Sequence, residues 1–305
     1  MKAKKIVVLI LKFIALTILY FICFAMASAL LFPSDGAPPA SAEQASTTVA
    51  ALLAVCFLNT IVLTYVILRS HWAGWRLILA VFFVSYGVMT IMSQIETAVF
   101  VTRLPAGMLP RIFLVGGIVA GLFSPISVLI LGKRKRDTSG NEANSRLVKP
   151  ASEWIWKLGL IAIAYLVLYF TFGYFIAWKN PAVREYYGGT DPGSFVAQMR
   201  TIMLGTPWLP FFQILRALMW TALALPVIRM MKGQWWEAGL AVGLLFAVLM
   251  NSQLLIPNPF MPATVRMVHL VETASSNFLF GWLIVWLLLH RREASRKLSS
   301  SSNGD

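Results

Sequence analysis

The stretch ATVRMVHLVETASSNFLFGWLIVWLLL, residues 263–289, decides the class of fold. It is long enough to cross a bilayer as a helix, because about 20 apolar residues span the hydrocarbon core. Its first part carries Arg266, His269 and Glu272, whereas residues 278–289 are almost purely apolar. An ionisable side chain at the centre of a membrane helix costs about 2.5–3.5 kcal/mol on insertion scales. We therefore expect these groups to face other helices or a water-filled cavity.

The apolar character of this stretch extends along the whole chain of 305 residues, which is 58% hydrophobic and 12% charged. A soluble protein carries about 25% charged residues. A net charge of +14 would suggest nucleic acid in a soluble protein, but here the basic residues lie at the ends of apolar runs. The sequence therefore predicts a lipid bilayer as partner, with anionic lipids at the cytoplasmic face, and no nucleic acid.

The apolar runs predict an all-α fold, a polytopic integral membrane bundle of about eight transmembrane helices. Cys23 and Cys56 both lie inside apolar runs, which argues against a structural disulfide. The first run is longer than the apolar core of a cleaved signal peptide, so we expect it to be retained. The expected helices cover residues 6–32, 47–69, 76–100, 111–132, 154–178, 207–231, 237–256 and 263–289.

Charge runs and a weak repeat divide the chain into two halves. Arg69 and Trp75 stand six residues apart, as do Arg229 and Trp235, and a Ser-Gln pair follows each tryptophan at a similar distance. The repeat predicts two related four-helix halves. The expected parts are an N-terminal membrane half (1–132), a cytoplasmic basic linker (133–153), a C-terminal membrane half (154–289) and a disordered cytoplasmic tail (290–305).

The connection between the fifth and sixth predicted helices contains helix signals of its own. An Asn-Pro pair at 180–181 starts one short helix and Gly188 ends it, while an Asp-Pro pair at 191–192 starts a second that Gly205 ends. We expect the segment 180–205 to form short helices on the outer membrane surface.

The distribution of Lys and Arg sets the expected orientation. Basic residues cluster near both termini and in the linker, and far fewer fall on the other side of the predicted helices. Because Lys and Arg are concentrated in cytoplasmic loops, both termini should be cytoplasmic, in the plasma (inner) membrane.

Polar residues of four predicted helices fall at one depth, in the outer half of the membrane. The inner halves of the same helices are comparatively apolar. We infer a polar cavity that opens to the outside beneath the segment 180–205. The candidate substrate or proton pathway consists of Glu96, Arg216, Asn251, Gln253, His269, Glu272 and Ser276.

The spacing of His269, Glu272 and Ser276 places them on one helix face. A buried carboxylate there must carry a proton or pair with a cation, for which Arg216, Arg111 and Arg266 are candidates. The functional interpretation is a proton relay or a ligand site. The structural interpretation is an interhelical hydrogen-bond network.

Two further interpretations concern neighbouring residues. His269, Glu272 and Glu96 offer three conceivable metal ligands, but the spacing is not specific, so we predict no metal and no cofactor. Tyr186 and Tyr187 are interpreted as surface residues, with gating of the cavity as the alternative.

Three classes of function fit these features. The leading hypothesis is a proton-coupled transporter of a small solute, in which Glu272 couples the proton to the substrate. The others are a membrane enzyme that acts on an outer-leaflet, lipid-linked substrate, and a non-catalytic accessory or sensory subunit. GxGxxG, Walker A, CxxC and HExxH motifs are absent from the sequence, which weighs against an enzyme. The expected ligand is a small molecule or a lipid.

Overall fold

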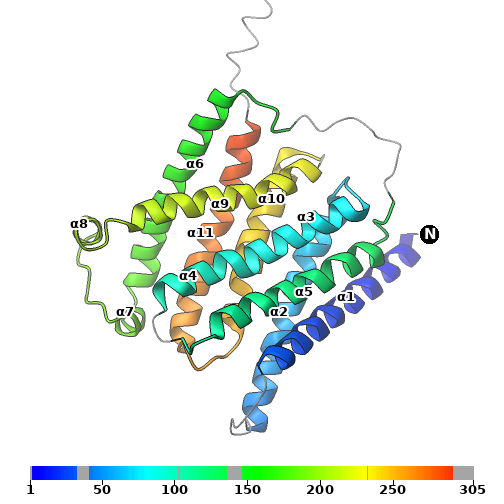
Figure 1. Cartoon of the computed structure of the whole chain (residues 1–305), viewed down its shortest axis with the longest axis horizontal. Coiled ribbons are helices and arrows are strands. Elements are labelled where there is room, and N and C mark those ends of the chain that lie inside the picture. The colour runs from blue at the N-terminus through cyan, green and yellow to red at the C-terminus, as the bar shows by residue number, and fades with distance from the viewer. Residues whose placement is uncertain (1, 33–40, 102–103, 136–145, 232, 291–305) are drawn as a thin grey trace, which may run out of the picture.

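The chain folds as a bundle of helices (Figure 1). The computed structural model describes residues 2–32, 41–101, 104–135, 146–231 and 233–290. Within these ranges the only β pairing is an isolated bridge between Ser70 and Met231. The prediction of an all-α membrane bundle is therefore confirmed.

Eight helices are long and apolar enough to cross a membrane within the described ranges. Several are built from successive helical pieces, so one span can carry more than one label. The spans are α1 (Lys2–Leu31), α2 (Ala42–Arg69), α3 to α4 (Gly74–Phe100), α5 (Met108–Ile130), α6 with η3 (Ala151–Trp178), α9 (Leu209–Met230), α10 to η5 (Trp235–Leu255) and α11 (Ala263–Leu289).

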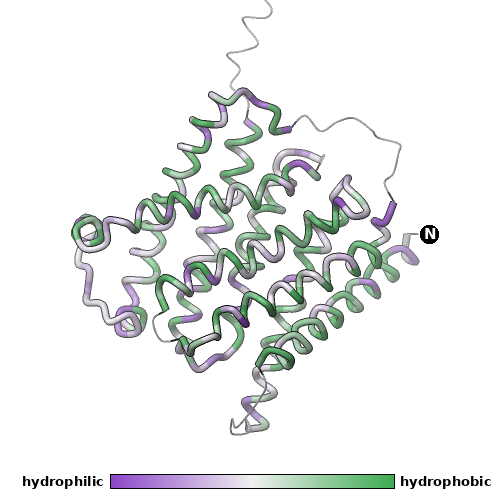
Figure 2. Tube along the Cα trace, in the orientation of Figure 1, coloured by the Kyte–Doolittle hydropathy of each residue, from purple (hydrophilic) through white to green (hydrophobic). Residues whose placement is uncertain are grey.

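The eight spans form two layers that cross (Figure 1). In one layer α1 packs on α5, α5 on α3, and α3 on α9. In the other, α2 packs on α10, α10 on α11, and α11 on α6. Trp220 of α9 and Phe246 join the layers in the core, with ring centroids 4.3 Å apart and both side chains fully buried. Figure 2 shows apolar residues along the spans and polar residues gathered mainly at their ends.

The closest packing between two spans brings α10 against α11. A Cβ added at Gly281 of α11 would lie 2.9 Å from the backbone of Val242 and Gly243. Small residues at such positions let membrane helices approach closely. The contact fixes α11, and with it Glu272 and His269, against the rest of the bundle.

Three spans contain a π-helical segment among the described residues, a feature that the apolar pattern did not indicate. These segments are η1 (Gly87–Met92) between α3 and α4, η3 (Gly173–Trp178) at the end of α6, and η4 (Leu245–Leu249) after α10. Short π-helical insertions occur frequently at functional sites. Here η1 and η4 contact each other inside the bundle.

Two short helices, α7 (Pro181–Tyr187) and α8 (Phe195–Gly205), lie together at one end of the bundle, which we call the α7–α8 end (Figure 1). Asn180 caps α7 and Gly188 ends it in the left-handed conformation. The predicted start of α8 at residues 191–192 is wrong. Ser194 caps α8 instead, because the Asp191 carboxylate accepts the Gly193 N–H at 2.9 Å and closes a turn before the helix.

Several other predicted boundaries shift. The second span starts at Ala42 rather than residue 47, because Ser41 and Gln44 form a capping box. The fifth starts at Ala151 rather than residue 154, which shortens the predicted linker. Residues 136–145 of that linker and the predicted tail beyond His290 lie outside the described residues.

Candidate functional site

The α7–α8 end of the bundle encloses a cavity of about 750 Å³. Its walls come from α4, α6 with η3, α7, α8, α9 and α11. Six of the seven candidate residues line it, namely Glu96, Arg216, Asn251, His269, Glu272 and Ser276. Gln253 does not line the cavity, because its Nε2 donates to the Met89 carbonyl at 2.7 Å and ties the end of the seventh span to η1.

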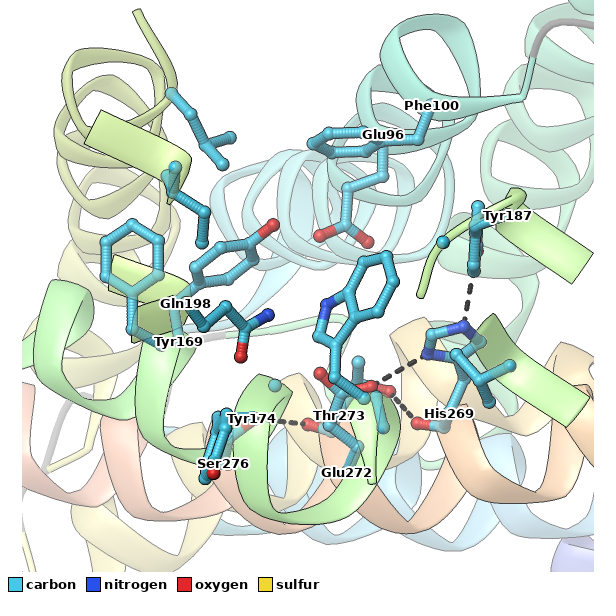
Figure 3. A pocket seen from close by; sticks show the side chains of 18 of the residues that line it. Glu96, Phe100, Tyr169, Tyr174, Tyr187, Gln198, His269, Glu272, Thr273 and Ser276 are labelled. Atoms are coloured by element: carbon cyan, nitrogen blue, oxygen red, sulfur yellow. Dashed lines mark hydrogen bonds and ion pairs between the residues drawn. The ribbon is translucent and has the colours of Figure 1, made fainter. Parts of the chain in front are cut away.

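A chain of hydrogen bonds leads from Glu272 to the short helix α7 (Figure 3). His269 Nδ1 lies 2.7 Å from Glu272 Oε2, and His269 Nε2 lies 3.2 Å from the Tyr187 hydroxyl. Burial raises the pKa of Tyr187, so its hydroxyl keeps its proton and can donate to Nε2. With its proton on Nδ1, the His269 ring donates to Glu272 Oε2 and accepts from the Tyr187 hydroxyl at Nε2, which satisfies both contacts.

Tyr187 is therefore part of the cavity wall and is half-buried. Its ring also packs edge-on against the His269 ring, with centroids 5.7 Å apart. Tyr186, by contrast, donates its hydroxyl to the Phe260 carbonyl at 2.9 Å and fastens α7 to the turn before α11.

The second charged pair of the cavity joins α4 to α9. Arg216 Nη1 lies 2.5 Å from Glu96 Oε1 and 2.9 Å from Gln213 Oε1. The Arg216 side chain is 1% exposed and the Glu96 side chain 27% exposed. Arg266 is committed elsewhere, because it donates to the Leu254 and Ile256 carbonyls. Of the candidate cations, Arg216 thus pairs with Glu96 and leaves Glu272 to His269.

Asn251 and Ser276 make bonds of a structural kind. Thr273 Oγ1 lies 2.5 Å from Asn251 Oδ1, and Asn251 Nδ2 donates to the Ala247 carbonyl at 2.9 Å. Ser276 Oγ donates to the Thr273 carbonyl at 3.3 Å. Of these three bonds, the one between Thr273 and Asn251 joins the seventh span to α11, as expected of polar side chains that bridge membrane helices, and the other two lie within a single span.

Several aromatic residues and one amide residue of the cavity were not among the candidates, namely Tyr165, Tyr169, Tyr174 and Gln198. Tyr165 and Tyr169 stand four residues apart on α6, and that spacing was the available signal for a common face. The Tyr174 hydroxyl donates to the Gly193 carbonyl at 2.6 Å and fixes the loop before α8. Gln198 of α8 is 8% exposed, and its Oε1 has no hydrogen-bond partner among the described residues.

The rim of the cavity carries a further carboxylate, Asp191. The hydrogen bond from the Gly193 N–H holds the pKa of Asp191 below its usual value, with smaller contributions from Arg184 and Lys179. Arg184 Nη2 lies 3.7 Å from Asp191 Oδ2. Asp191 therefore has a cationic partner at the rim.

The charges of the lining do not cancel. Glu96, Asp191 and Glu272 are the lining carboxylates, and Arg216 is the only Lys or Arg among the lining residues that the structure describes. Arg216 pairs with Glu96. Among the described residues, the side chain that contacts the Glu272 carboxylate is therefore His269 and not an Arg or Lys. The described part of the chain contains no group of three or more His, Cys, Asp or Glu side chains arranged to hold a metal ion.

Comparisons with protein-family models, with curated proteins and with solved structures find no match to the chain. The cavity is therefore the feature from which the function is inferred.

Proposed function

We propose that the protein is a proton-coupled transporter of the plasma membrane that binds its substrate in this cavity. The observation that carries the proposal is the chain from Glu272 through His269 to Tyr187, which links a carboxylate inside a membrane span to a helix at the bundle end. Ionisable residues within membrane spans are typical of proton and substrate pathways.

The chain can move a proton in two coupled steps. His269 Nε2 takes up a proton when the Tyr187 hydroxyl turns away, which makes the ring cationic. Nδ1 then passes its own proton to Glu272 Oε2 and the ring becomes neutral again. The other titratable or charged groups that surround Glu272 are Tyr165, Tyr169 and Tyr174 of α6 and η3, Arg216 of α9 and Glu96 of α4.

The cavity is closed toward the opposite end of the bundle. Phe280 packs against Tyr165 with ring centroids 4.6 Å apart, and Ile284 and Leu288 follow on α11, all fully buried or nearly so. Such one-sided access is one of the two states that an alternating-access transporter needs. With the α7–α8 end outside and both termini cytoplasmic, this state faces outward.

The arrangement of the spans supports two related halves that can move against each other. In the first half α1 packs on α2 and α5, and in the second α6 packs on α9 and α11 in the corresponding way. The two loops that the repeat equates meet, since Ser70 pairs with Met231 and the His71 N–H donates to the Met230 carbonyl at 2.9 Å. The segments η1 and η4 lie where the halves touch.

The test is proton movement in proteoliposomes that contain a pH-sensitive dye. Under an imposed pH gradient, amines, amino acids and sugars are added one class at a time. A substrate should change the internal pH with the wild type, and Glu272→Gln should abolish the change. Glu185→Gln, at an exposed position of α7, is the matched control and should behave as wild type.

Two results would count against a transporter. The internal pH could change without any added solute and to the same extent with the wild type and with Glu272→Gln. That result would show a proton leak that does not involve Glu272. If no class of solute changes the internal pH although both proteins are folded, the result would favour the accessory-subunit or enzyme alternatives.

A further inference from the structure

One face of α11 continues from the cavity to the opposite end of the bundle. Its first part lines the cavity. Its second part lines an apolar groove on the side of the bundle, between α6 and α11. Successive members are three or four residues apart, which keeps them on a single face. The face consists of His269, Glu272, Ser276, Leu279, Leu283 and Trp286.

The groove and the cavity meet at one side chain. Leu168 of α6 lines both. The groove is otherwise lined by aliphatic and tryptophan side chains, including Ala164 and Trp282. From Glu272 to Trp286 the helix rises about 21 Å at about 1.5 Å per residue. The two hollows therefore lie end to end along α11, with Leu168 between them, polar at one end and apolar along the rest.

Two acceptor oxygens at the polar end receive no hydrogen bond from the described residues. No described residue donates a hydrogen bond to Glu272 Oε1, which points toward Gly173 of η3, where an added Cβ would lie 3.5 Å away. Gln198 Oε1 is buried without a partner. Both are acceptors, so a group that carries N–H donors satisfies them.

Charge and aromatic content favour a cation at the same place. An anion would meet the unmatched Glu272 carboxylate, while Arg216 is already paired with Glu96. A cation gains from Glu272 and from the nearby rings of Tyr165, Tyr169 and Trp178.

We propose that the substrate is a single-chain amphiphile with an ammonium head. The head lies between Glu272 and Gln198, and the alkyl chain follows the groove between α6 and α11. This inference rests on the proposed function and names its substrate class. The carboxylate of Glu272 binds either a proton, which arrives and leaves through His269, or the ammonium head, so the exchange is one cation for one proton.

The chain and the head contribute in different ways. Lipid is as apolar as the groove, so burial of the chain adds little affinity by itself. The alkyl chain instead concentrates the ligand in the membrane and admits it to the cavity from the side. Selectivity between ligands of equal chain length therefore comes from the head.

The test is equilibrium binding to the full chain in phosphatidylcholine nanodiscs, with empty nanodiscs subtracted. The probes are dodecylammonium, butylammonium, dodecyl sulfate and dodecanol, all below their micelle concentrations. Dodecylammonium should saturate one site, with affinity at least about tenfold above that of each other probe, a difference of about 1.4 kcal/mol.

Three variants locate the two ends of the site. Glu272→Gln should weaken dodecylammonium about tenfold and leave dodecanol unchanged. Ala164→Phe fills the groove and should weaken dodecylammonium but not butylammonium. Ile163→Phe, on the neighbouring 59% exposed position, is the control and should have no effect.

The outcomes separate this inference from the proposed function. Equal binding of dodecylammonium and dodecanol, or binding that Ala164→Phe leaves intact, would mean annular lipid contact only and would overturn it. Proton-coupled flux of a small polar solute without dodecylammonium binding would overturn the inference and leave the transporter standing. Saturable binding with the variant effects above, but without proton movement, would support the ligand site and remove the transporter.

Discussion

Loss of Glu96 should destabilise the protein more than loss of Arg216, because Arg216 is the more deeply buried partner of this ion pair. The Arg216 side chain is 1% exposed and its Nε has no hydrogen-bond partner among the described residues, whereas the Glu96 side chain is 27% exposed to the cavity. Removal of one partner of a buried ion pair leaves an uncompensated charge. Glu96→Gln should therefore lower the free energy of unfolding by about 3 kcal/mol, and Arg216→Met by about 1 kcal/mol or less.

Chemical unfolding in detergent micelles measures both values, and the double variant provides the control. Glu96→Gln with Arg216→Met should recover most of the loss, because no unpaired charge then remains. If Arg216→Met lowers the free energy of unfolding as much as Glu96→Gln does, the predicted difference between the two partners is wrong.

The sequence indicated which ionisable residues lie at one depth of the bundle more readily than how they pair. Depth along each apolar run placed Glu96, Arg216, His269 and Glu272 together, because helix rise converts residue number into depth. Pairing depends on side-chain directions across helices, which spacing within one helix does not contain. Gln198 was missed because its short amphipathic helix shows no depth signal.

At the scale of elements, the contact of α10 with α11 controls where Glu272 stands. Gly281→Ala should lower the free energy of unfolding by about 2 kcal/mol, since its Cβ would meet the backbone of Val242 and Gly243 rather than a side chain that can turn away. Thermal unfolding of the purified protein measures the change.

Gly159→Ala of α6 is the matched control. No heavy atom lies within 4 Å of its added Cβ, so the better helix propensity of alanine should leave stability unchanged or raise it by up to about 1 kcal/mol. Equal stability of the two variants would show that α10 and α11 are not held by backbone contact.

Helix ends were predictable where a cap or a stop was local, and less so where tertiary contacts decide. The last span has the predicted bounds because Pro262 precedes it and the apolar run ends at Leu289. The π-helical segments η1, η3 and η4 depend on packing between helices. The apolar pattern of a single segment contains no information on such packing. The Asp-Pro signal at 191–192 failed because Asp191 bonds to the loop itself.

For the whole molecule, the number of spans followed from the apolar runs, whereas the crossing of two layers did not. Crossing requires contacts between segments far apart in sequence, such as Gln253 Nε2 with the Met89 carbonyl at 2.7 Å. The proposed relation between the halves combines both kinds of information. Arg69 and Arg229 suggested it in sequence, and the meeting of their loops supports it in space.

The orientation of the bundle is the remaining property at this scale. Arg69, Arg76, Lys133 and Arg229 lie near the end opposite to α7 and α8, as the excess of basic residues in cytoplasmic loops requires if that end is inside. Glu185 of α7 and Ser152 of α6 are exposed and stand on either side of one span. They are therefore suitable positions for single cysteines.

Glu185→Cys should react with a membrane-impermeant maleimide on intact cells, and Ser152→Cys only after the membrane is permeabilised. The wild type is the control, because Cys23 and Cys56 are both buried and should stay unlabelled. The reverse pattern would turn the bundle over and place the cavity on the cytoplasmic side, so that Glu272 would exchange protons with the cytoplasm. Labelling of both cysteines on intact cells would mean that α6 does not cross the membrane.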